Sequence, residues 1–190
     1  MKKGRMEAFS DGVFAIIITI MVLELKVPHG MDLNSLIPLI PKFLSYVLSF
    51  IFLAIYWNNH HHLCQAIERV NGRILWANIH LLFWLSLIPF VTGWMGENNF
   101  AEVPTAAYGV VLLFAAIAYY VLELTIIASE GEHSKLKAAV GNEIKAKISL
   151  VIYGLAIPFS FVNTKIALIF FVLVALMWLV PDKRIEALEK

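Results

Sequence analysis

The sequence has little charge for its length. Asp, Glu, Lys and Arg make up 15% of the 190 residues, whereas a soluble domain carries about 25%. Hydrophobic residues reach 60%, against about 45–50% in an average soluble chain. This balance excludes a mainly soluble protein and predicts a polytopic helical membrane protein. The net charge of +1 gives no general attraction for nucleic acid.

Cysteine and the common catalytic motifs are also scarce. Cys64 is the single cysteine, so no intrachain disulfide can form and the redox compartment stays open. The sequence has no P-loop, no nucleophile–base arrangement and no HExxH helix motif, so we expect no enzymatic activity, catalytic residue or cofactor. The run His60–His62 is a weak metal candidate, because adjacent side chains on a helix point in different directions. No metal site is expected.

Six apolar segments can be drawn along the chain, and about 20 residues suffice to cross a hydrocarbon core of about 30 Å. They predict an all-α protein with six transmembrane helices in a single domain, 1–190. The last two segments could instead form one re-entrant hairpin, although "FVNTK" is a credible turn between two spans. The mixed-charge loop between the fourth and fifth segments could form a short amphipathic surface helix. The expected helices are 6–27, 36–57, 74–95, 104–128, 146–162 and 166–180.

The basic residues are distributed unevenly between the two sides of this topology. All but three of the 15 Lys and Arg residues fall on the side of the two termini. The three exceptions are Lys26, Lys42 and Lys165. Because cytoplasmic loops are enriched in Lys and Arg, both termini are expected in the cytoplasm, and the protein in the inner (plasma) membrane.

The first apolar segment begins with charged and polar residues, which allows two interpretations. Ser10 or Asp11 could cap a helix that starts there, but 12–27 would then span only about 24 Å. A start near Met6 gives a comfortable length and places both residues inside the helix, near the membrane boundary. Polar groups there are usually paired with protein or water. The sequence therefore favours a polar network between helices.

One face of the same helix carries no charge. With 3.6 residues per turn, this face contains Gly12, Ile16, Ile20, Leu23 and Val27, and Thr19 flanks it. By pattern alone, packing against neighbouring helices is the simpler interpretation. Thr19 can hydrogen-bond to its own backbone, so its presence decides little.

The start of this helix carries a recognisable motif. Arg5-x-x-x-Phe9-Ser10-Asp11 resembles the RxxxFSD signature of the lysosomal potassium channel family, transmembrane protein 175. The cluster of Trp57, His60 and His61 and the stretch "LSLIPFVTGW" give weaker support. The resemblance implies a homotetramer in the lipid bilayer whose first helices line a central pore for K⁺. The TVGYG filter loop of ordinary potassium channels is missing from that family and from this sequence.

The resemblance also assigns roles to residues. It implies that Ile16 is the narrow point of the pore, that Ile20 and Leu23 form the next rings, and that Thr19 contributes to ion selectivity. Glu24 would lie at the outer mouth. A structural network, not ion binding, is implied for Arg5, Ser10 and Asp11. Apart from the resemblance, we expect Phe9, Trp57, His60 and His61 to belong to the same network.

Two other functions stay open on the sequence. A secondary or proton-coupled transporter would use ionisable residues at mid-membrane and broken helices, for which Glu123 and Pro158 are thin evidence. No inverted repeat supports it. A purely structural membrane scaffold is the third possibility, and it would show no ion flux.

Overall fold

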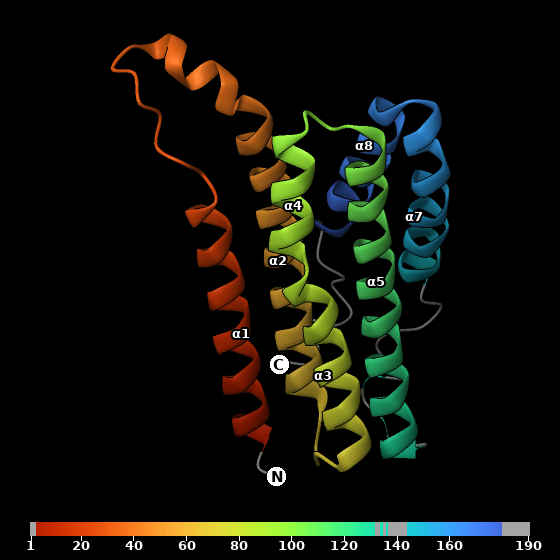
Figure 1. The fold of residues 1–190 in the computed structure, drawn as a ribbon. Coiled ribbons are helices and arrows are strands. Elements are labelled where there is room, and N and C mark those ends of the chain that lie inside the picture. Colours follow the sequence, from red (N-terminus) through yellow and green to blue (C-terminus); the bar gives the residue numbers. More distant parts are fainter. Residues whose placement is uncertain (1–2, 132–133, 135, 137–143, 180–190) are drawn as a thin grey trace.

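The computed structural model describes residues 3–131, 134, 136 and 144–179. Over these residues the chain is a bundle of helices with no strand, which confirms the expected all-α membrane architecture (Figure 1). The elements are α1 (Lys3–Leu23), a 3-10 helix η1 (Leu33–Leu39), α2 (Ile40–Ala66), α3 (Gly72–Ser86), α4 (Ile88–Glu97), α5 (Glu102–Glu130), α7 (Ile144–Val162) and α8 (Thr164–Leu179).

The lengths of these helices suit a lipid bilayer. Within the described residues, five helical segments are long and apolar enough to cross a membrane, and α8 is a shorter apolar helix of 16 residues. The five segments are Lys3–Leu23, Leu33–Ala66, Gly72–Glu97, Glu102–Glu130 and Ile144–Val162. Most of the expected surface loop between the fourth and fifth segments lies outside the described residues. So do six of the basic residues used for orientation: Lys2, Lys135, Lys137, Lys183, Arg184 and Lys190.

The first helix is shifted toward the N-terminus relative to the expected 6–27. It begins at Lys3 and ends at Leu23, and the backbone then turns, with Leu25 N–H donating to Val22 C=O at 3.1 Å. Pro28 has no N–H to give to the carbonyl of Glu24, and it disfavours helical geometry in the residue before it. Glu24 and Val27 therefore lie beyond the helix.

The second helix continues nine residues past its expected end at Trp57. Its last turns contain "NNHHHLCQA", which is polar enough to suggest a loop. Two of these polar side chains are bonded within the protein: Asn59 donates to the Ile55 carbonyl at 2.8 Å, and His60 is bonded to Asn78 of α3. Leu63 and Cys64 are buried and anchor the last turn. Tertiary contacts thus override the polar appearance of this segment.

The third expected helix is divided into α3 and α4 at Leu87. Pro89 has no N–H for the carbonyl of Leu85, which interrupts the ladder. Leu87 N–H donates instead to the Trp84 carbonyl at 3.2 Å, three residues back. The break places α4 close to α2, where an added Cβ at Gly96 would lie 2.8 Å from Lys42 Cα.

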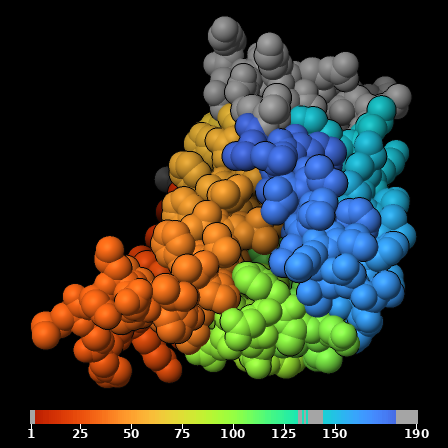
Figure 2. Space-filling model, turned by 90° about the horizontal axis from the view of Figure 1, so that it is seen from above, coloured from red at the N-terminus to blue at the C-terminus, as the bar shows by residue number. Residues whose placement is uncertain are grey.

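The bundle has a clear order from one edge to the other. α1 stands at one edge and packs on α2, α3 and α4, while α7 and α8 form a hairpin at the opposite edge, against α5 (Figure 1). Buried aromatic and aliphatic side chains fill the space between, among them Phe52, Tyr108 and Phe171. The segment that joins α1 to α2 stands away from the body of the molecule (Figure 2).

Candidate functional site

The two faces of α1 have opposite environments. The buried face contains Met6, Ser10, Phe14, Ile17 and Met21. On the other face, Ile16 is 59% exposed, Ile20 43% and Leu23 77%. Gly12 and Thr19 are exposed on the same side. The apolar stripe identified in the sequence is therefore the face of α1 that this chain leaves uncovered, and we refer to Gly12, Ile16, Thr19, Ile20 and Leu23 as the α1 stripe.

A groove runs beside the α1 stripe. One wall is formed by α1, including Val13, Ile16 and Ile20, and the other by Ser86, Pro89 and Phe90 at the α3–α4 break. The groove has a volume of about 380 Å³. Phe90 is 67% exposed, so the wall on α4 offers a large apolar surface. The groove thus joins the stripe to a second uncovered apolar element.

Hydrogen bonds fix the rotation of α1 about its axis. Ser10 Oγ donates to the Met6 carbonyl at 2.9 Å and accepts from Asn78 Nδ2 at 3.0 Å. The Oδ1 atom of Asn78 lies 2.7 Å from His60 Nε2. All three side chains are buried, and a buried polar group is costly unless it is bonded. This chain links α1, α3 and α2 in the interior.

A second set of polar contacts lies closer to the surface at the same end. Trp57 Nε1 donates to Asp11 Oδ1 at 2.9 Å, and His61 Nδ1 lies 3.2 Å from Glu7 Oε1. The rings of Trp57 and His61 are stacked. We call these four residues, together with Ser10, Asn78 and His60, the collar. The collar joins α1 to α2 over little more than one turn of each helix, and to α3 through Asn78.

Two members of the collar are not among the residues predicted for the network. The sequence motifs assign no role to Asn78. It is the residue that bridges Ser10 and His60, and an amide in an otherwise apolar span was the signal for it. Glu7 carries the contact to His61. His62 has a partner within the protein as well.

Two residues of the RxxxFSD motif lie outside the collar. Arg5 is exposed and, among the described residues, makes no hydrogen bond or ion pair. Phe9 is 59% exposed. Both residues extend the α1 stripe toward the N-terminus, because Arg5, Phe9, Gly12 and Ile16 share one helical face. Lys3 instead ties this end to α2, through a bond of 2.9 Å to the Gln65 carbonyl.

The C-terminal end of the stripe carries the remaining candidate residues. Thr19 Oγ1 is bonded to the backbone carbonyls of Ala15 and Ile16 at 3.0 and 2.9 Å. A hydroxyl that donates to the backbone keeps lone pairs for another partner. Glu24 follows the helix and lies in a small recess with the ion pair of Lys42 and Glu97, whose N–O distance is 2.8 Å.

Comparison with known proteins assigns the chain to a family. A potassium channel of Chryseobacterium sp. (strain P1-3) is 60% identical over 98% of this chain and 97% of its own length. The sequence model of the family described as endosomal/lysosomal potassium channel TMEM175 matches residues 5–89. The chain belongs to the TMEM175 family.

A solved structure from the TMEM175 family has the same fold, and an animal relative matches in sequence over part of its length. The crystal structure of a lysosomal potassium-selective channel TMEM175 homologue from Chamaesiphon minutus superposes with a TM-score of 0.79, at 28% identity over 93% of this chain and 95% of that one. The chicken endosomal/lysosomal proton channel TMEM175 is 28% identical over 70% of this chain but only 30% of its own length. The residues matched by the TMEM175 model extend from α1 into α4, and so include the collar and the α1 stripe.

Proposed function

We propose that four copies of this chain form a potassium-permeable channel in the plasma membrane, with the four α1 stripes facing a central pore. Relatives named potassium channels and the TMEM175 match support the channel activity. The observation that carries the arrangement is the division of α1: one face is buried and bonded through the collar, while the opposite face is apolar and uncovered. A helix that lines a pore needs one face held by the rest of the subunit and another face left open to the pore.

The apolar rings act as a gate and not as a binding site. Four copies of Ile16, with Ile20 and Leu23 further along, offer no oxygen to replace the hydration shell of K⁺. A narrow hydrophobic neck can exclude water and so raise a barrier to the ion. Opening then requires α1 to tilt or rotate until water fills the neck. The collar is the pivot for that movement, because it holds the inner half of α1 to α2 and α3.

Thr19 gives the pore its only ring of hydroxyls along the stripe. Its proton is directed to the backbone, so the oxygen lone pairs are free to face a passing cation. Four such oxygens offer partial compensation for lost hydration and give moderate selectivity for K⁺ over Na⁺. Glu24 adds negative charge at the outer mouth, which concentrates cations there. Both termini then lie in the cytoplasm, in agreement with the basic residues of the sequence.

Reconstitution in planar bilayers tests this proposal. With unequal K⁺ and Na⁺ on the two sides, the reversal potential is expected to lie toward the K⁺ equilibrium value. Ile16→Asn is expected to raise the current, because a polar ring wets the neck. Ile169→Asn on α8 is the matched control: Ile169 is 56% exposed, close to the 59% of Ile16, but lies in the α7–α8 hairpin at the opposite edge of the bundle.

The same recordings separate the other functions. Saturating, coupled flux without channel events would point to a carrier, and no flux at all would point to a scaffold. A reversal potential that follows the proton gradient would contradict potassium permeation. Equal effects of Ile16→Asn and Ile169→Asn would contradict the position of the constriction while leaving the channel activity standing.

A further inference from the structure

The segment that joins α1 to α2 projects from the end of the bundle opposite the collar. It extends past α1, on the side away from α5, α7 and α8 (Figures 1 and 2). Its helical part, η1, has no buried residue and packs on α2, the helix that it leads into. We call this segment, residues 24–39, the arm.

The arm has a defined shape although it stands apart. Asp32 Oδ1 accepts a hydrogen bond from Ser35 N–H at 3.2 Å, and Ser35 Oγ donates to the Asp32 carbonyl at 2.7 Å. Gly30 fits this turn because an added Cβ would lie 2.8 Å from Ser35 Cβ. Pro28 and Pro38 restrict the backbone on either side. The arm therefore presents its side chains in a fixed arrangement.

The side chains that the arm presents are largely apolar. Val27 and Leu33 are each 83% exposed, and Leu36 and Ile37 are 48% and 58% exposed. A 3-10 helix has three residues per turn, so Leu33 and Leu36 lie in one row along η1. Burial of such a row is favourable by about 25 cal/mol per Å². Uncovered apolar patches of this kind mark sites of contact with protein or membrane.

The chain does not need the arm to cross the membrane. α2 alone has 27 residues, which make about 40 Å of helix, whereas the hydrocarbon core measures about 30 Å. η1 precedes this helix at the end opposite the collar, so its apolar residues lie beyond the length required for the crossing. Contact with another protein surface accounts for them better than contact with acyl chains.

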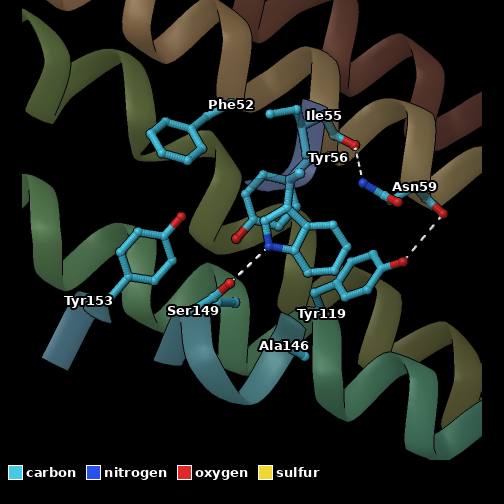
Figure 3. A pocket seen from close by; sticks show the side chains of 10 residues that line it. Phe52, Ile55, Tyr56, Asn59, Tyr119, Ala146, Ser149 and Tyr153 are labelled. Carbon is cyan, nitrogen blue, oxygen red and sulfur yellow. Dashed lines mark hydrogen bonds between the residues drawn. The ribbon is translucent and has the colours of Figure 1, made fainter. Parts of the chain in front are cut away.

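The arm lies on the same side of the chain as the α1 stripe. At the other edge, bonds within the chain join the helices to one another. Tyr119 donates to the Asn59 carbonyl at 3.4 Å, and Trp178 donates to Ser149 at 2.8 Å (Figure 3). These bonds tie α5 to α2 and α8 to α7. The arm extends in the opposite direction, beyond the uncovered face of α1.

We propose that the arm packs on a neighbouring copy of this chain. The inference rests on the proposed function: if four α1 stripes face one pore, a segment that extends past α1 meets the next copy. A closed ring of identical copies uses a contact in which one surface of each copy meets a different surface of the next. The arm is one such surface.

Each copy also has apolar side chains to receive an arm at this end of the bundle. Phe90 and Trp94 of α4 are 67% and 37% exposed, and their ring centroids lie 6.0 Å apart. The contact holds the end of α1 that the collar does not hold. Each α1 is then fixed within its own chain at one end and by the next copy at the other, which couples the movements of the four helices.

Photo-cross-linking of the full chain in liposomes tests this inference. A benzophenone amino acid replaces Leu33 in the arm or, as the matched control, Val162 at the end of α7. Both side chains are highly exposed, at 83% and 78%, but Val162 lies at the opposite edge of the bundle. We expect chain-to-chain products to be several-fold more abundant from position 33. Lipid adducts alone, or equal yields from the two positions, would overturn the proposal.

Light scattering and current recordings on the same samples separate this inference from the proposed function. Lipid adducts alone from an assembled, conducting channel would overturn the role of the arm and leave the channel standing. Chain-to-chain products without K⁺ current would support the arm contact and contradict the channel. A monomeric protein would contradict both.

Charged substitutions in the arm provide a second measurement. Leu33→Asp combined with Leu36→Asp is expected to lower the assembled fraction in detergent several-fold. The melting temperature of the single chain should stay unchanged, because neither side chain is buried within it. Val162→Asp is the control and should leave the assembled fraction unchanged. A double variant that assembles as well as the unmodified chain would overturn the proposal.

Discussion

The two faces of α1 show how one helix can be both anchored and exposed. Its buried face is bonded to the rest of the bundle through Ser10, and its N-terminal half also through Glu7 and Asp11. Its opposite face carries Ile16, Ile20 and Leu23, which are 43–77% exposed among the described residues. In the proposed channel, the polar residues of this helix hold it in the bundle, while its apolar residues face the ions.

The largest effect is expected at Asn78, on the anchored side. Asn78→Leu removes the bonds to Ser10 and His60 together and leaves the imidazole buried without its amide partner. This is expected to lower stability by about 1–3 kcal/mol, measured as the unfolding transition of the detergent-solubilised protein. Asn34→Leu, at an exposed site in η1, is the control and should change little. A stable Asn78→Leu protein with normal currents would show that α1 is held by packing alone.

Asp11 is expected to have a smaller effect, because its contact is partly exposed. Asp11→Ala removes the acceptor of the Trp57 indole, which is expected to cost about 1 kcal/mol and to weaken assembly. Asp11→Asn keeps an acceptor oxygen and should rescue most of the loss. A double-mutant cycle with Trp57→Phe in size-exclusion and thermal-melt assays isolates the bond. Additive losses would mean that Asp11 stabilises the protein without acting through Trp57.

The smallest effect is expected on the uncovered side. An added Cβ at Gly12 would meet no atom of this chain within 4 Å, and alanine is favoured over glycine in a helix by about 1 kcal/mol. Gly12→Ala is therefore expected to leave the melting temperature of the protein unchanged or slightly raised. A marked loss of stability would show that a neighbouring subunit packs closely at this point.

Much of α1 could be predicted from the sequence, because the signals for it lie within one helix. They are the motif around Phe9, Ser10 and Asp11 and the apolar repeat at Ile16, Ile20 and Leu23. The bond between Asn78 and Ser10 joins residues 68 positions apart, which periodicity does not show. Likewise, the nine added residues of α2 are stabilised by contacts of His60 with another helix, so local polarity gave the wrong end.

The boundaries of the helices were harder to predict than their number. Pro28 and Pro89 were visible in the sequence, but their effect depends on which carbonyl loses its partner. The backbone hydrogen bonds of Leu25 and Leu87 mark where α1 and α3 end.

The central claim is that the α1 stripe lines a pore filled by water in the open state, and thiol accessibility tests it most directly. The chain has one cysteine, Cys64, which is buried, so the background is low. Ag⁺ applied to reconstituted channels is expected to block current through Ile16→Cys, Ile20→Cys and Leu23→Cys, and to spare Phe14→Cys and Ile17→Cys. Block of the second group, or insensitivity of all three stripe positions in conducting channels, would contradict the account, since a lipid-facing thiol is not reached by an aqueous cation.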